Sequence, residues 1–151
     1  MNRVLLNEER QQLKSIRLLF IYIAGTLGAL LLLAIAFSQV QGPLMPGISV
    51  NRKWLLAGAA LISFIFTVSA KKQIRTGIYK ARHSPEPLTG KLVKYRRALV
   101  VYMLLSGLSI LVCLAFSLLT GDFVFQVFAA VLLGYLLAEA PREEKILARL
   151  P

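Results

Sequence analysis

Long apolar runs, separated by polar or basic stretches, dominate the pattern of the chain. There are four runs of sixteen to twenty-three residues, and none contains a charged residue or a histidine. A helix needs about 20 apolar residues to cross the ~30 Å hydrocarbon core of a bilayer. The runs are continuous and not alternating, which favours helices over barrel strands. We therefore expect an all-α integral membrane protein, a small antiparallel bundle of four transmembrane helices. The expected spans cover about residues 17–37, 54–70, 98–120 and 123–138.

Two of the runs allow another interpretation. The fourth run has sixteen residues and as a helix covers only about 24 Å, so it could be a buried or re-entrant segment. It can still span if the bilayer thins locally. The first run, with its basic flank and Ala34-Ile35-Ala36 near its end, resembles a signal peptide. It is longer than a usual signal-peptide core, and three more runs follow, so we expect it to be retained.

The segments between the runs carry their own signals. Asn7 followed by Glu8 and Glu9 predicts a helix start, because acidic side chains favour the positive end of the helix dipole. Residues 71–97 keep a helical pattern on both sides of a Pro-rich turn, and Thr89 is a candidate cap for the second half. We expect helices 2 and 3 to extend into a basic hairpin there.

The distribution of lysine and arginine predicts the orientation. Alternate flanking segments hold sixteen and two of these residues. Basic residues accumulate in cytoplasmic loops, so both termini, the 71–97 hairpin and a tail at 139–151 are expected to be cytoplasmic. We expect a plasma (inner) membrane. This bias accounts for most of the net charge of +11, so no nucleic-acid partner is needed.

The basic hairpin is the main candidate site. Cations close to an anionic leaflet each contribute about 1 kcal/mol of attraction. The hairpin could therefore hold anionic headgroups of the lipid bilayer or a cytoplasmic partner, or it could only set the topology. The candidate residues for lipid or partner binding are Lys71, Lys72, Arg75, Lys91, Lys94, Arg96 and Arg97.

Small residues recur every four positions in each apolar run. Helices in lipid associate through small residues that let backbones approach closely. Four such stripes in four spans predict a compact bundle, which could associate with itself or with another membrane subunit. The candidate packing residues are Gly25, Gly28, Ala59, Ser63, Ser109, Cys113, Ala130 and Gly134.

Signals for chemistry are missing from the apolar runs. Charged residues and histidine inside a membrane usually mark function, and the runs hold no Asp, Glu, Lys, Arg or His. The single cysteine cannot form an internal disulfide or a CxxC site, and His83 with Glu86 in a turn is too small a set for a metal site. Gln126 near a membrane edge could face the interface or bond another helix.

We therefore expect no catalytic, cofactor-binding or metal-binding residues. The sequence favours a non-enzymatic accessory or scaffold subunit that contacts anionic lipid or a cytoplasmic partner. The alternative is an oligomeric pore or carrier for a small neutral solute, lined by the Ser and Thr side chains of helices 2 and 3.

Overall fold

The described part of the chain folds into four helices, three long and one short. The computed structural model describes residues 7–44, 52–142, 145, 146 and 148. Three helices are long and apolar enough to cross a membrane, and the fourth is apolar but shorter. The prediction of an all-helical chain with four helices is confirmed. The helices are α1 (Asn7–Gln41), α2 (Arg52–Arg82), α3 (Leu88–Thr120) and α4 (Phe123–Ala138).

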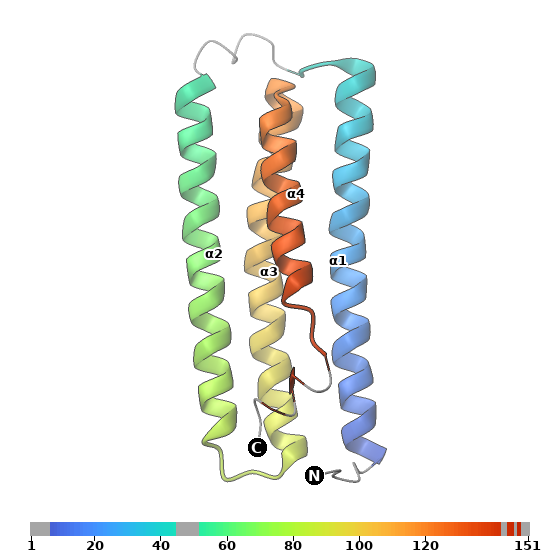
Figure 1. Ribbon diagram of the computed structural model, residues 1–151, viewed down its shortest axis with the longest axis vertical. Coiled ribbons are helices and arrows are strands. Elements are labelled where there is room, and N and C mark those ends of the chain that lie inside the picture. The colour runs from blue at the N-terminus through green and yellow to red at the C-terminus, as the bar shows by residue number, and fades with distance from the viewer. Residues whose placement is uncertain (1–6, 45–51, 143–144, 147, 149–151) are drawn as a thin grey trace.

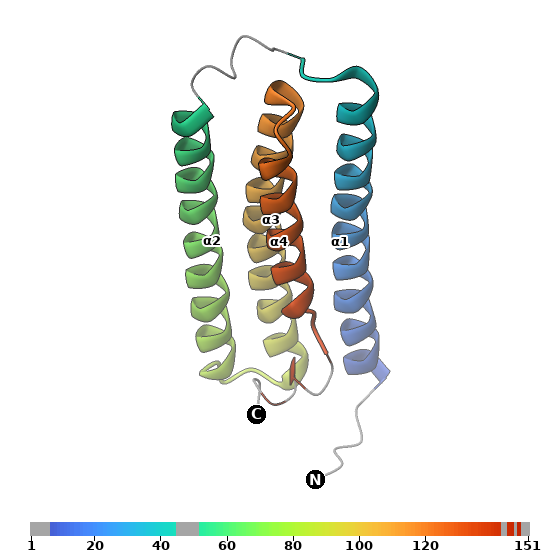
Figure 2. The same cartoon turned by 45° about the horizontal axis from the view of Figure 1, so that its top comes forward.

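Helix α3 is the centre of the structure. It packs against α1, α2 and α4, and α4 also contacts α1. Figure 1 shows α1 and α2 on opposite sides of α3, with α4 in front of it, and Figure 2 keeps this arrangement. The most deeply buried α3 side chains include Met103 and Ile110, both fully covered. Because each of the other helices packs on α3, its burial holds the four together.

Each helix boundary has a local cause. The described part of α1 starts at Asn7, with Glu8 and Glu9 in its first turn, so the helix start expected at Asn7 stays a prediction. The expected cap at Thr89 is wrong, because α3 already begins at Leu88. Pro87 is its N-cap, with an extended backbone at ψ 165° and no side-chain cap, since its ring fixes φ near the helical value without needing an N–H donor.

The connection between α3 and α4 is tight and consists of Gly121 and Asp122. Gly121 adopts the left-handed conformation at φ 68° and donates its N–H to the Ser117 carbonyl, a backbone state that glycine reaches without a steric penalty. Asp122 is the next N-cap and accepts a hydrogen bond from the Val124 N–H at 3.1 Å. The two helices are therefore antiparallel neighbours.

The three long helices continue beyond the end of the short one. Both α2 and α3 are uninterrupted through the basic region and are joined by residues 83–87. We call this end, which also holds the start of α1, the lower end, and the opposite end the upper end (Figure 1). The expected tail 139–151 is described only at 139–142, 145, 146 and 148. There Ile146 is 2% exposed and belongs to the core, together with Leu13 and Leu92.

Candidate functional site

The cationic side chains lie mainly below the end of α4. Each helix residue adds about 1.5 Å, so positions can be compared by counting from the upper ends Gln41, Arg52 and Thr120. On this count Arg17, Lys72 and Arg97 lie about 36, 30 and 35 Å down their helices. All three side chains are exposed. Three separate helices therefore present a cation at nearly the same level, which we call the cationic girdle.

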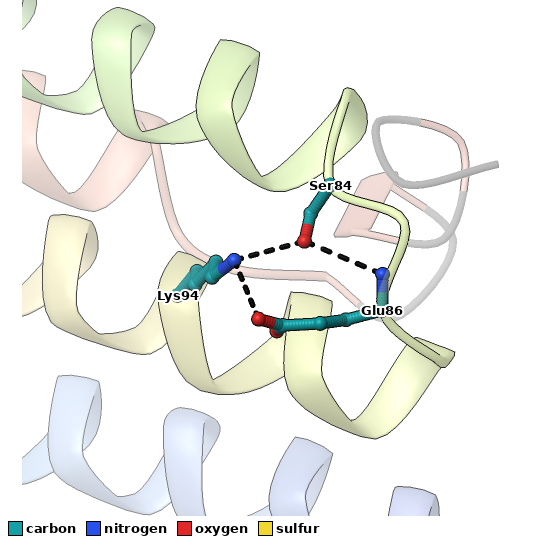
Figure 3. A network of polar contacts seen from close by, with 3 residues as sticks. All are labelled: Ser84, Glu86 and Lys94. Atoms are coloured by element: carbon teal, nitrogen blue, oxygen red, sulfur yellow. Dashed lines mark hydrogen bonds and ion pairs between the residues drawn. The ribbon is translucent and has the colours of Figure 1, made fainter.

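One candidate for lipid or partner binding, Lys94, makes its polar contacts within the chain. Lys94 donates to the Ser84 hydroxyl at 2.8 Å and pairs with the Glu86 carboxylate at 2.8 Å. The Glu86 backbone N–H also points to the Ser84 hydroxyl at 3.4 Å. Figure 3 shows the three side chains converging on the turn between α2 and α3. Lys94 therefore holds the turn and has less freedom to meet an external anion.

A second candidate is engaged with α4. The Lys71 ammonium lies 4.8 Å from the centre of the Tyr135 ring, within the range of a cation–π contact. This contact joins α2 to the last turn of α4, where the helix dipole also favours a positive charge. Lys71 is still an exposed residue, so it can serve this contact and face solvent.

The remaining candidates differ in exposure. Lys72, Arg75 and Arg97 are exposed, whereas Lys91 and Arg96 are half-buried. The structure thus separates the seven residues that the sequence grouped together. The three exposed cations are the better candidates for contact with a partner, because their charges reach the surface.

The candidate packing residues also separate into groups. Ser63 and Cys113 meet between α2 and α3, with 3.4 Å between oxygen and sulfur, and the Ser109 hydroxyl donates to the Ser63 carbonyl at 3.3 Å. Ala59, one turn from Ser63, is 2% exposed. These four residues therefore lie in the core of the structure.

The small residues of α1 and α4 are placed differently. A side chain added at Gly28 would meet Leu133 of α4 at 3.8 Å, whereas Gly25 and Gly134 have nothing within 4 Å. Ala130 is exposed. Gly25 and Gly134 therefore have no close neighbour among the described residues, and a packing role for these two and for Ala130 stays a prediction.

Two further contacts define how the helices pack. Gln126 is 6% exposed and donates to the Ser38 hydroxyl of α1 at 2.6 Å, so the bond to another helix, one of the two possibilities that the sequence left open, is present. Gly77 of α2 lies so close to Ala98 of α3 that an added Cβ would overlap the alanine methyl group. Gly77 lies outside the four apolar runs, so the predicted stripes of small residues do not include it.

Potential metal ligands are dispersed in the part of the chain that the structure describes. Those residues contain no group of three His, Cys, Asp or Glu side chains able to hold a metal ion. Comparison of the chain with protein-family models, curated proteins and solved structures found no match. Function is therefore inferred from the geometry of the chain itself.

Proposed function

We propose that the chain is an integral membrane protein with its lower end in the cytoplasm. Support comes from large apolar side chains on the outer faces of the helices. Leu32 is 68% exposed, Phe64 66% and Val131 64%. Soluble monomers rarely expose extended apolar patches, whereas lipid tails cover such faces at no cost. The basic lower end then faces the cytoplasm, in line with the bias of cations toward that side.

Within that membrane the protein acts as a non-enzymatic accessory or scaffold subunit that holds anionic lipid headgroups at the cytoplasmic surface of a plasma (inner) membrane. The observation that carries this proposal is the cationic girdle. Arg17, Lys72 and Arg97 lie about 30–36 Å from the upper ends of their helices. The hydrocarbon core is ~30 Å thick, and headgroups begin at its edge. The girdle is therefore at the level where it meets phosphate groups of the inner leaflet.

Lipid enrichment in nanodiscs tests this proposal. The protein is reconstituted in phosphatidylcholine with a minor share of phosphatidylserine, and the lipids retained by the protein after gentle extraction are counted by native mass spectrometry. Neutralising the girdle with Arg17→Gln, Lys72→Gln and Arg97→Gln should reduce retained phosphatidylserine, because each cation contributes about 1 kcal/mol near an anionic surface.

A matched control uses the same chemistry at the other end. Lys53 is exposed near the start of α2, at the upper end, and Lys53→Gln should leave phosphatidylserine retention unchanged. Equal loss from the two variants, or no loss from the girdle variant, would refute specific headgroup binding by the girdle.

The pore or carrier alternative has less support from this geometry. Its lining would need Ser63 and Ser109, which are 7% and 0% exposed and bonded to each other's helices. In a single chain these hydroxyls are committed to the contact between α2 and α3. The alternative therefore depends on an oligomer in which these helices separate.

A further inference from the structure

The sides of α1 and α2 that face α4 carry cationic residues below the end of α4. On α1, a side chain at Gly28 would meet Leu133 of α4 at 3.8 Å. Arg17 and Arg10 come eleven and eighteen residues before Gly28, about three and five full turns. They therefore lie on the same side of α1, and Lys14 lies between them one turn from each.

The corresponding side of α2 is also cationic. Lys71 marks it by its 4.8 Å contact with the Tyr135 ring of α4. Arg75 and Arg82 follow four and eleven residues later, about one and three turns on. Since α1 and α2 stand on opposite sides of α3 (Figure 1), the two sides approach the same region below α4. We call these six exposed residues the cationic faces: Arg10, Lys14, Arg17, Lys71, Arg75 and Arg82.

The segment after α4 enters this region. Figures 1 and 2 both show the chain descending from the end of α4 alongside the lower half of α3. Pro141 is buried and Ile146 is 2% exposed, whereas Arg142 and Lys145 are exposed. The segment therefore docks through an apolar side. Ile146 thus marks a position in the core cluster that accepts an apolar anchor.

The lower part of the cationic faces lies beyond the reach of lipid headgroups. Arg10 and Arg82 are each about 45 Å from the upper ends of their helices. Hydrocarbon ends at ~30 Å, and a headgroup layer adds about 5–8 Å on each side. A ligand that contacts the whole length of both faces must therefore come from the aqueous phase.

We propose that the cationic faces form a docking surface for an acidic amphipathic segment of a soluble protein, which competes with the chain's own segment around Ile146. Charge complementarity selects the acidic residues of the partner, and the position held by Ile146 selects its apolar anchor. The inference rests on the proposed orientation in the membrane, and it does not depend on lipid binding by the girdle.

A synthetic peptide provides the probe. It carries Leu at positions i, i+3, i+4 and i+7 of a helix and Glu at most others, with a fluorescent label, and its anisotropy is measured against the full chain in nanodiscs of uncharged phosphatidylcholine. Saturable binding that exceeds the binding of a scrambled peptide of the same composition is expected. Absence of saturable binding, or equal binding of the scrambled peptide, overturns the proposal.

Two variants that remove the same charge locate the site. Arg10→Gln, Lys14→Gln and Arg82→Gln together remove three cations from the cationic faces and should weaken binding about tenfold. The control variant carries Lys72→Gln, Lys80→Gln and Arg97→Gln, which remove three exposed cations from other faces. It should weaken peptide binding less than twofold. Equal losses would show attraction to diffuse charge and would overturn the proposal.

If the peptide competes with the chain's own segment, loosening that segment should raise the affinity of the peptide. Ile146→Ala weakens the hold of that segment, so the peptide should bind more tightly to this variant. Unchanged or weaker binding contradicts a shared site. The control variant above also removes two girdle residues, so loss of phosphatidylserine retention with intact peptide binding would separate the two proposals.

Discussion

The α2–α3 contact and the α1–α4 contact are built on different principles. Along α2 and α3 the helices approach closely because small residues face each other, and at Gly77 and Ala98 there is no room for another methyl group. Between α1 and α4 the side chain at Gly28 would have ordinary contact distance, and a hydrogen bond from Gln126 to Ser38 links the two helices. The α2–α3 contact depends on close steric fit, whereas the α1–α4 contact depends more on a hydrogen bond.

This difference has a consequence for tolerance to mutation. Dispersion contacts at close range are lost steeply when the surfaces are pushed apart. A polar link between membrane helices averages only ~0.6 kcal/mol, with a maximum of ~1.7. The α2–α3 contact should therefore be sensitive to added volume, and the α1–α4 contact should tolerate change at its one hydrogen bond.

The largest effect is expected for Gly77→Ala. The new methyl group overlaps that of Ala98, and overpacking of this kind costs about 1–3 kcal/mol. Thermal unfolding of the purified protein in detergent should show a lower midpoint. The same change at Gly58, which has nothing within 4 Å, should leave the midpoint unchanged or raise it, since alanine is the better helix former.

A second substitution tests the cause of that loss. Ala98→Gly removes the opposing methyl group, so the double variant Gly77→Ala with Ala98→Gly should recover most of the lost stability. If the two changes simply add, the close approach at this point is not the cause, because coupled residues in contact should not behave independently.

Gln126→Leu is expected to have a smaller effect. It removes the 2.6 Å bond to Ser38, while the Ser38 hydroxyl keeps its own bond to the Ala34 carbonyl. The unfolding free energy should fall by about 0.6–1.7 kcal/mol. A double-mutant cycle with Ser38→Ala measures the coupling directly, and a coupling near zero would mean that this bond does not hold α4 to α1.

The helices could be predicted from the sequence because their signals are local. Apolar runs and the Thr120-Gly121-Asp122 turn are local patterns, and the observed helices follow them. Helix α3 begins at Leu88, directly after its N-cap Pro87, two residues earlier than a cap at Thr89 would place it. Helix number and approximate length therefore follow from local sequence.

Contacts between helices were harder to predict, because they depend on which side of each helix faces which neighbour. The small size of Ser63 and Cys113 predicts packing but not the partner, and the two side chains meet because α2 packs on the central helix α3. Gln126 had two possible surroundings, and only the packing of α4 on α1 selects one. Lys94 seemed equivalent to its neighbours until the turn brought Ser84 and Glu86 beside it.

The smallest effect on stability is expected at the turn between α2 and α3, where Lys94 pairs with Glu86. The Lys94 and Glu86 side chains are 42% and 45% exposed, and exposed ion pairs contribute about 0.2–1 kcal/mol. Glu86→Gln should therefore lower the unfolding free energy by less than ~1 kcal/mol, and the loss should shrink at high salt. A salt-independent loss would assign the effect to the helix start and not to the ion pair.

The most direct test of the account is the accessibility of single cysteines in membrane vesicles of known orientation. Cys113 is first replaced by serine, and cysteines are then placed singly at Gln41, Leu32, Phe64 and His83, all exposed in the structure. A membrane-impermeant thiol reagent should label position 41 only from the outer side and position 83 only from the cytoplasmic side. Positions 32 and 64 should stay unlabelled until detergent is added. Labelling of 32 or 64 in intact vesicles, or of 41 and 83 from the same side, would contradict the proposed membrane topology.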